Sequence, residues 1–262
     1  MEDFHWGAEQ VDPKEKSLPG LKTAFLLKHV PERGAVLEFG SGDGKNLRTL
    51  HGHRPELTLE GCDIRQPPTP PDTYRFTLLE GETLPRSLHG RFDVVLVMDV
   101  LEHVPNPART LDEVAAALRP GGKLVAFVPV EGQPLSAYRA YRKLLGDELY
   151  VETKEHIQAF THRELRSLIE RRFRIDATDY AYHALGHVMD ATFFAAHRLR
   201  TLRRFWATEN QYYNAGKAEA GGKVGAFNAV LRAANTVAWA ESRILRSTSV
   251  TAAGQLVAAT LR

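Results

Sequence analysis

The stretch VLEFGSGDGKN, residues 36–46, joins an apolar run to a turn with glycines at alternate positions. A strand that ends in a glycine-rich turn and leads into a helix is typical of nucleotide-binding α/β folds. The dinucleotide fingerprint reads G-x-G-x-x-G, whereas this turn reads G-x-G-x-G, and Asp43 places a carboxylate where phosphates would lie. A Walker phosphate loop is excluded, because Phe39 stands at its first glycine and Asn46 at its Ser or Thr. The spacing therefore disfavours NAD and the phosphate-loop nucleotides.

The segments around this turn alternate between strand and helix patterns as far as about residue 175, which predicts βαβ units and a parallel sheet. FDVVLVMDV, from Phe92, is the clearest strand, because its centre is continuously apolar as a central parallel strand should be. Strands are expected at 35–39, 57–62, 73–79, from 92, at 123–130 and 173–178, and near the C-terminus in AGQLVAATLR. The expected fold is α/β: a doubly wound, Rossmann-like, seven-stranded and mostly parallel sheet, with a C-terminal antiparallel strand and a helical insertion.

Composition indicates an ordinary globular protein, since 43% of the 262 residues are apolar and 25% are charged. The single cysteine, Cys62, excludes an internal disulfide framework and makes a reducing compartment the default. The first ten residues are polar and acidic, which is unlike a secretory signal, and no run approaches the roughly 18 apolar residues of a membrane-spanning helix. We therefore expect a cytoplasmic protein, with a peripheral membrane location as the alternative.

Polar residues cluster where the predicted strands end, which is where ligands bind in a doubly wound sheet. Glu38 and the glycine turn follow the first strand, Asp63 follows the second, Glu80-Gly81-Glu82 follows the third and DVLEHV, from Asp99, follows the fourth. These positions form the candidate site.

Four segments together resemble a class I S-adenosylmethionine-dependent methyltransferase, of the subgroup that includes the ubiquinone-biosynthesis O-methyltransferases. They are VLEFGSGDG, CDI, LEGETLP, and the long stretch from FDVVLVMDVLEHV through RPGG to the next strand. The resemblance covers about residues 35–130 and implies S-adenosylmethionine as the cofactor, with S-adenosylhomocysteine as its product. This cofactor has no phosphate, in agreement with the glycine spacing.

The resemblance also implies a role for each residue at the strand ends. Glu38 and the glycine backbone would surround the amino-acid end of the cofactor, and Asp63 would accept both ribose hydroxyls, as one carboxylate can. Glu80 would lie near adenine, although the family often has aspartate there. The implied cofactor-binding set is Glu38, Gly40, Ser41, Gly42, Asp63, Ile64, Glu80, Gly81, Met98, Asp99 and His103.

Three histidines are candidate catalytic bases, because a hydroxyl acceptor must lose a proton and histidine titrates near neutral pH. By resemblance, His103 lies near the cofactor and acceptor, and His156 lies in a segment that packs over the site. His187 shares a predicted helix face with His183 and Asp190. Ordinary packing is the alternative for each histidine. We expect no metal site, because magnesium prefers oxygen ligands and this last group is mostly imidazole.

The C-terminal third carries the basic charge, since residues 183–262 contain ten Lys or Arg and four Asp or Glu. A pattern at 191–208 sets arginines at 198–204 beside an apolar face. It fits a helix packed on the sheet with solvated arginines, a peripheral membrane contact, or contact with an acidic or lipid-linked substrate.

The expected domains are an N-terminal cap with the first helix (1–33), a cofactor-binding α/β core (34–182), a helical insertion that caps the acceptor site (183–250) and a closing strand (251–262). The expected activity is O-methylation of a small molecule or a glycan or lipid conjugate by in-line transfer with a histidine base. The alternatives are an N- or C-methyltransferase and a non-catalytic cofactor-binding protein. Nucleic acid is disfavoured as a partner, because the chain has no NPPY-type motif for an extruded base. The oligomeric state is left open.

Overall fold

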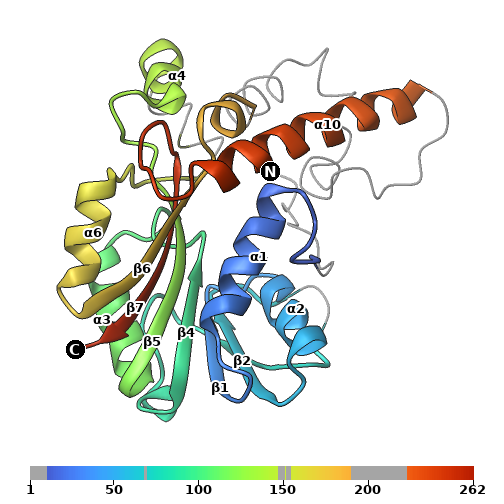
Figure 1. Ribbon diagram of the computed structural model, residues 1–262. Coiled ribbons are helices and arrows are strands. Elements are labelled where there is room, and N and C mark those ends of the chain that lie inside the picture. Colours follow the sequence, from blue (N-terminus) through green and yellow to red (C-terminus); the bar gives the residue numbers. More distant parts are fainter. Residues whose placement is uncertain (1–10, 68–69, 147–150, 152–154, 190–222) are drawn as a thin grey trace.

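The computed structural model describes residues 11–67, 70–146, 151, 155–189 and 223–262. Seven strands form one sheet in the order β3-β2-β1-β4-β5-β7-β6 (Figure 1). The strands are β1 (Gly34–Phe39), β2 (Leu57–Asp63), β3 (Arg75–Leu78), β4 (Phe92–Met98), β5 (Leu118–Pro129), β6 (Phe173–Ala181) and β7 (Gly254–Leu261). The helices are α1 (Leu18–His29), α2 (Lys45–His53), the short 3₁₀ helix η1 (Arg86–Leu88), α3 (Pro107–Ala117), α4 (Ala137–Leu145), α6 (His162–Glu170) and α10 (Lys223–Ile244).

The sheet is parallel except at β7, which runs antiparallel to both of its neighbours, β5 and β6. β1 pairs in parallel with β2 on one side and with β4 on the other. The chain therefore builds outward from β1 in one direction and then restarts at β4 in the other. This is the topological switch point at which doubly wound sheets bind their ligands. The predicted seven-stranded, mostly parallel sheet with an antiparallel C-terminal strand is confirmed.

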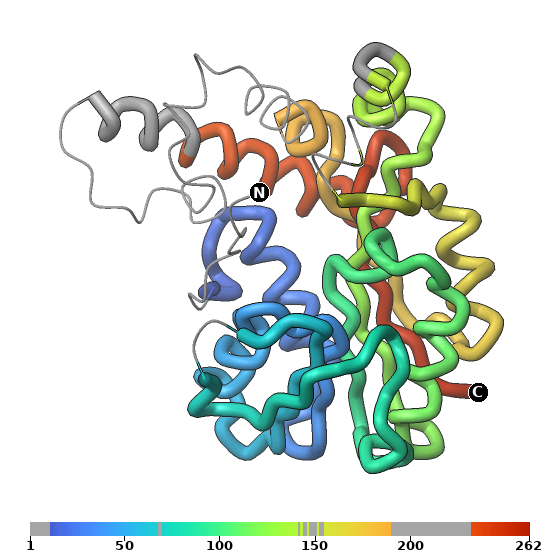
Figure 2. Tube along the Cα trace, turned by 180° about the vertical axis from the view of Figure 1, so that it is seen from behind, coloured from blue at the N-terminus to red at the C-terminus, as the bar shows by residue number. Residues whose placement is uncertain are grey.

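Both faces of the sheet are covered, which explains why the central strands are continuously apolar. Neighbouring residues show this: Val36 packs in the layer with α1 and α2, whereas Leu37 packs in the layer with α3 and α6, and both are fully buried. In the view from behind, the two groups of helices lie on opposite sides of the sheet (Figure 2). The site at the strand ends is thus built on rigid elements.

Helix starts follow the local sequence signals. Asn106 caps α3 by accepting a hydrogen bond from the Arg109 amide, and Pro107 occupies the first turn. Thr161 and Glu164 form a reciprocal capping box at the start of α6.

The fifth strand starts earlier than the sequence predicts. RPGG was expected to separate the helix from a strand at 123–130, but β5 begins at Leu118, which pairs with Phe92. The pairing then shifts register, so that Val94 lies opposite Lys123, and Gly121 has a φ of 75°. A bulge of this kind accommodates extra residues in one strand, so a glycine-rich stretch remains within the ladder.

Parts of the predicted insertion and cap lie outside the described residues. These include the basic stretch at 198–204 and most of the helix expected from residue 186, so the predicted domain boundaries stay predictions. Of the insertion, the structure describes a turn of helix at 184–189 and α10, which projects away from the sheet (Figure 1). None of the helices in the described ranges is long and apolar enough to cross a membrane.

Candidate active site

The glycine turn after β1 needs left-handed backbone at each of its alternate glycines. The φ angles of Gly40, Gly42 and Gly44 are 72°, 48° and 75°. A side chain at Gly40 would come within 2.6 Å of Val100, and one at Gly44 would collide with the Tyr74 hydroxyl. At Gly42, by contrast, no atom of the described residues lies within 4 Å of the Cβ position. The turn is therefore packed on the protein side and open on the side of the predicted cofactor.

Two buried polar atoms beside this turn have no hydrogen-bond partner within the described part of the chain. They are Oε2 of Glu38, a residue only 1% exposed, and Oγ of Ser41. The other Glu38 oxygen accepts a hydrogen bond of 2.6 Å from Asn46 Nδ2. Burial raises the pKa of Glu38 to about 8. Unsatisfied buried groups next to an open turn fit a ligand that brings hydrogen-bond donors, as the ammonium of S-adenosylmethionine would.

Asp63 ties the end of β2 to the glycine turn. Its Oδ2 accepts a hydrogen bond of 2.8 Å from the Gly42 amide, and its Oδ1 accepts one of 3.0 Å from the Arg65 amide. Each carboxylate oxygen can accept a second hydrogen bond, so the ribose role remains open. Ile64 beside it is 60% exposed, and Glu80 and Gly81 follow the neighbouring strand β3. The cofactor roles of these residues stay predictions.

A lysine that the sequence analysis missed reaches the end of β4 from α1. Lys22 Nζ lies 2.8 and 3.0 Å from the two carboxylate oxygens of Asp99 and 3.6 Å from the centre of the Phe127 ring. Burial, the largest single influence, would lower the pKa of Lys22, but the charges of Asp99 and Tyr182 and the hydrogen bond to Asp99 together outweigh it, so the pKa is raised. Asp99 has a φ of 54° and follows the buried Met98. Left-handed backbone outside glycine is uncommon, and it concentrates at functional sites.

His103 and His156 meet above the ends of β4 and β5. Their ring centroids are 4.8 Å apart in an edge-to-face arrangement. His156 Nδ1 lies 3.0 Å from Oε2 of Glu131, and His103 Nε2 lies 3.8 Å from Oε1 of Glu102. Burial, followed by the neighbouring His156, lowers the pKa of His103. The two histidines thus sit between two carboxyl groups.

Glu102 is buried beneath this pair, and neither of its carboxyl oxygens has a hydrogen-bond partner among the described residues. Burial, followed by the charge of Asp99, raises its pKa well above the ordinary value. In the described ranges, Glu102, His103 and His156 are the one group of histidine, cysteine and acidic residues whose donor atoms converge, within 4.8 Å of one another. That spacing is close enough to share a metal ion. The predicted absence of a metal rested on other residues and is not tested.

The His187 side chain lies away from this pair and contacts the start of α4. Its Nε2 accepts a hydrogen bond of 3.0 Å from the Ala137 amide, and its ring stacks on Tyr138 with centroids 4.8 Å apart. His183 contacts the Thr248 carbonyl at 3.1 Å, and Asp190 lies outside the described residues. The structure therefore brings together two of the three candidate bases. His187 accepts a hydrogen bond from the first residue of α4, and the catalytic role of His187 stays a prediction.

Lys22, Glu102 and Glu131 are the charged residues at this site that sequence reasoning left out. Glu102 lies within the motif DVLEHV, but Asp99 and His103 are the residues of this motif that the sequence predicts for the site. Glu131 follows the fifth strand, so the rule that functional groups stand at strand ends would have found it. Lys22 precedes all the motifs, and no local signal marks it.

A doubly wound sheet with an open glycine turn and acidic strand ends at its switch point defines an α/β protein that binds a nucleoside cofactor. A family model described as "Methyltransferase domain" matches residues 14–172. The ubiquinone biosynthesis O-methyltransferase of Psychrobacter cryohalolentis is 44% identical over 106 residues, which are 40% of this chain and 37% of that protein. Its namesake from Xylella fastidiosa is 28% identical over 137 residues, 47% of this chain and 52% of that protein. The chain thus spans about half, or less, of the length of these curated relatives.

A solved structure of geranyl diphosphate C-methyltransferase from Streptomyces coelicolor, in complex with Mg²⁺, geranyl diphosphate and S-adenosylhomocysteine, superposes with a TM-score of 0.56. The superposition covers 94% of this chain and 80% of that one at 15% identity, so it shows the fold alone. The family model, however, covers more than half of the chain. The chain therefore belongs to the methyltransferase domain family. It is a class I methyltransferase domain whose cofactor is S-adenosylmethionine.

Proposed function

We propose that this protein transfers the methyl group of S-adenosylmethionine to a hydroxyl oxygen, with a histidine as general base. The acceptor is a small molecule or a glycan or lipid conjugate. The observation that carries the proposal is the His103–His156 pair, which stands between Glu102 and Glu131 at the same edge of the sheet as the predicted cofactor residues. The O-methyltransferase names of the curated relatives support oxygen as the atom methylated.

A carboxyl group and an ammonium group suit the two ends of the cofactor's methionine part. Glu38, with its unsatisfied oxygen, would hold the ammonium, and Lys22, which pairs with Asp99, would hold the carboxylate. Asp63 would accept the ribose hydroxyls. When bound, the cofactor supplies a methyl group on a sulfonium, which is a good leaving group. The protein has mainly to align the acceptor oxygen with that methyl and exclude water.

The base matters because an alcohol or phenol keeps its proton near neutral pH. As the new carbon–oxygen bond forms, the acceptor proton passes to an imidazole nitrogen and the sulfur retains the electron pair of the broken bond. The lowered pKa of His103 keeps that ring neutral near pH 7, so it is able to accept a proton. His156, whose ring lies 4.8 Å from that of His103, is the second candidate for the role.

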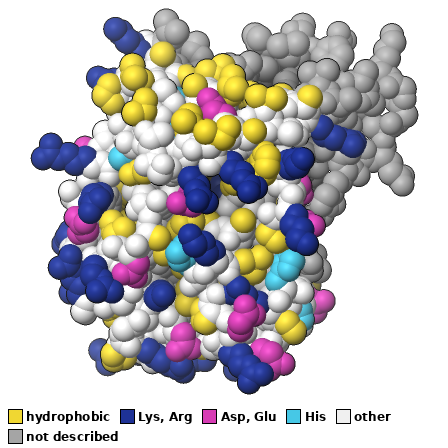
Figure 3. Space-filling view, viewed as in Figure 1, with side chains coloured by type: hydrophobic (Ala, Val, Ile, Leu, Met, Phe, Trp, Pro, Cys, Tyr) yellow, Lys and Arg dark blue, Asp and Glu magenta, His cyan; other side chains and the backbone are white. Residues whose placement is uncertain are grey.

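Apolar surface near the insertion supports an acceptor with an apolar part. Large apolar side chains of the described residues are exposed at Leu185, Val188, Val237, Ile244 and Val250, by 48 to 77%. Figure 3 shows yellow side chains gathered along the top of the molecule, where α10 lies. An exposed apolar patch is typical of a binding surface. A peripheral membrane contact through residues 198–204 and a cytoplasmic location remain part of the proposal, and nucleic acid remains disfavoured.

Methylation of nitrogen is the main rival, because a neutral amine attacks without a base. Catechol and its isosteric diamine, 1,2-phenylenediamine, separate the two as matched probes with S-adenosylmethionine carrying a tritiated methyl group. We expect label in catechol, and a loss of about a hundredfold in the double variant H103Q/H156Q, the usual contribution of a general base. Equal labelling of the diamine, unaffected by the substitutions, would refute the histidine-assisted oxygen transfer. Calorimetric titration with S-adenosylhomocysteine shows whether each variant still binds the cofactor.

A further inference from the structure

Glu131 stands beside His156 and belongs to none of the motifs that mark the cofactor site. We infer that Glu131 is a positioning residue that holds His156 with its proton on Nδ1 and its lone pair on Nε2, ready to take the proton of the acceptor hydroxyl. This inference rests on the proposed O-methylation. It selects His156 over His103 as the base.

The contact between Glu131 and His156 is short and largely shielded from solvent. His156 Nδ1 lies 3.0 Å from Glu131 Oε2, and the two side chains are 11% and 2% exposed. A carboxylate only accepts hydrogen bonds, so the proton of a neutral His156 must lie on Nδ1 for this contact to be a hydrogen bond. Away from water such a bond is strong, and it fixes both the tautomer and the plane of the ring.

The backbone holds both partners in place. Glu131 lies between Val130, whose amide donates to the Ala253 carbonyl at 2.7 Å, and Gly132, whose amide donates to the Phe160 carbonyl at 2.9 Å. A side chain at Gly132 would collide with the Ala159 carbonyl, so glycine permits this close approach. Glu131 is therefore anchored on both sides.

The segment that carries His156 is held as firmly. The amides of Ile157 and Gln158 both donate to the Glu102 carbonyl, each at 3.0 Å. Glu155, directly before His156, has a φ of 57°, a costly conformation for a residue other than glycine. Strain of this kind persists where the surrounding contacts over-determine it, and here it turns the chain so that the His156 ring enters the site.

His103 is oriented differently, which separates the roles of the two rings. Its Nδ1 lies 2.9 Å from the Glu155 carbonyl, an acceptor, so Nδ1 carries the proton and Nε2 faces the buried carboxyl of Glu102. Glu102 is the buried carboxyl on that side, and burial raises its pKa. The Nε2 of His103 thus faces a protein carboxyl at 3.8 Å, whereas the carboxyl beside His156 lies at its Nδ1, at 3.0 Å, where a carboxylate would stabilise an imidazolium.

The proton and electrons balance in this arrangement. The acceptor oxygen forms a bond to the methyl carbon, the carbon–sulfur bond breaks with its pair on sulfur, and the acceptor proton moves to His156 Nε2. The resulting imidazolium forms an ion pair with Glu131 and later loses its proton to water.

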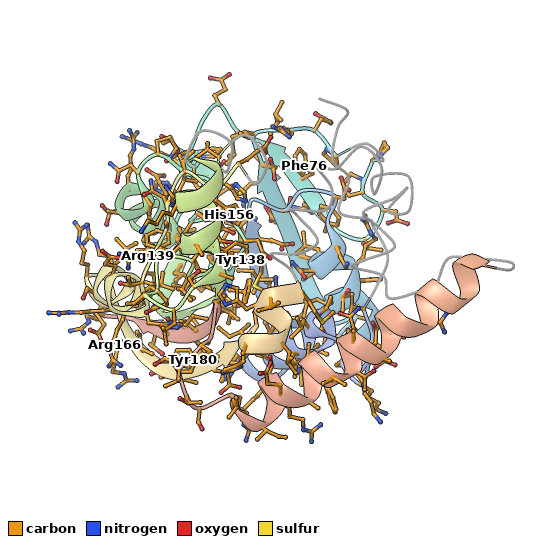
Figure 4. The ribbon with its side chains drawn as sticks, turned by 90° about the horizontal axis from the view of Figure 1, so that it is seen from above. Phe76, Tyr138, Arg139, His156, Arg166 and Tyr180 are labelled. Atoms are coloured by element: carbon orange, nitrogen blue, oxygen red, sulfur yellow. The ribbon has the colours of Figure 1, made fainter. Side chains whose placement is uncertain are left out.

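Seen from above, His156 lies near the middle of the molecule together with Tyr138, whereas Arg166 points outward at the edge (Figure 4).

Nitrogen NMR of the imidazole rings tests the assignment without any acceptor. In long-range proton–nitrogen spectra of the histidine-labelled protein at about pH 8, the two nitrogens of a neutral ring reveal which one carries the proton. The variant H156Q identifies the His156 signals. We expect His156 as the Nδ1-protonated tautomer in the wild type and as a mixture of tautomers in E131Q, whose amide can either donate or accept. A wild-type ring protonated on Nε2, or an unchanged tautomer in E131Q, would overturn the inference.

Turnover supplies the second readout, with E60Q as the matched control. Glu60 is also a buried glutamate, 5% exposed. It lies in the middle of β2, away from the strand ends, and pairs with Arg91. With catechol as acceptor, we expect kcat to fall about ten- to a hundredfold in E131Q with little change in KM, as for other groups that orient a functional histidine. E60Q should keep the wild-type kcat.

A more acidic probe distinguishes base positioning from a merely structural role. The hydroxyl of 4-nitrocatechol ionises far more readily than that of catechol, so its methylation should depend less on a base. E131Q should therefore lose less activity with 4-nitrocatechol than with catechol, whereas a structural defect would slow both equally and refute the inference. Absence of wild-type transfer to either probe would count against the proposed function, and the NMR result would still decide the tautomer held by Glu131.

Discussion

Replacing Glu38 by glutamine should change how the stability of the cofactor-free protein depends on pH. Burial places the pKa of Glu38 at about 8 in the folded protein, against an ordinary value of 4.5. Between these two values the native state binds a proton that the unfolded chain has lost. The free energy of unfolding must then fall as pH rises, because ionisation is favoured in the unfolded state.

The magnitude follows from the separation of the two pKa values. Each pKa unit corresponds to about 1.4 kcal/mol, so a separation of about 3.5 units gives at most about 5 kcal/mol. Rearrangement and entry of water reduce this cost, so about 2 to 4 kcal/mol is a reasonable expectation. The penalty begins above the unfolded pKa of 4.5 and is complete only above the folded pKa of about 8. Even the lower figure is a large part of the stability of a typical domain.

Urea unfolding, followed by far-ultraviolet circular dichroism between about pH 5 and 9, measures this effect. The difference in unfolding free energy between E38Q and the wild type should move in favour of E38Q as pH rises. Glu102, whose pKa is also raised, contributes the same slope to both proteins and cancels in the comparison. E56Q, which alters an exposed glutamate, is the matched control and should follow the wild type. Parallel profiles for E38Q and the wild type would refute the reasoning.

Three further predictions concern the cofactor and the chemistry. D63N should weaken S-adenosylhomocysteine binding by about 1 to 3 kcal/mol in calorimetry, because a charged acceptor of the ribose hydroxyls is lost; unchanged affinity would remove Asp63 from the cofactor site. K22M should weaken the same binding about tenfold or more, since the cation offered to the carboxylate disappears, and equal affinity for K22M would assign Lys22 to neutralising Asp99 alone. EDTA should leave methyl transfer to catechol unchanged if His103 and His156 act as bases, whereas a loss restored by Mg²⁺ would assign the pair to a metal.

The positions of the candidate cofactor residues could be predicted because these residues follow strands and lie within short motifs, whereas their roles stay predictions. The alternate glycines, Asp63 and Asp99 all stand at strand ends, and parallel strands bring those ends to one edge of the sheet. The left-handed φ angles of Gly40, Gly42 and Gly44 supply the physical reason for the glycine spacing.

Other contacts at and near the site join residues that are far apart in the sequence, and periodicity does not contain them. Lys22 reaches Asp99 across 77 residues of sequence, and His187 meets Ala137 across 50. Helix-face reasoning grouped His183 with His187, but their rings have different partners: His183 contacts the Thr248 carbonyl, and His187 accepts from the Ala137 amide. The predicted start of β5 was wrong for a different reason. Arg119 to Gly122 has the sequence of a turn, but the pairing with β4 accommodates these residues as a bulge.

The position of β7 has a consequence for how the chain acquires its structure. Among the described strands β6 pairs only with β7, and β7 is synthesised after the whole of residues 182–253. During synthesis β6 therefore has no place in the ladder until that later segment emerges and inserts beside β5. The nascent protein should pass through a five-stranded stage, β3-β2-β1-β4-β5, that holds the glycine turn while β5 presents an unpaired edge. Cofactor binding at that stage would favour the partly folded sheet at the moment it is most exposed to aggregation.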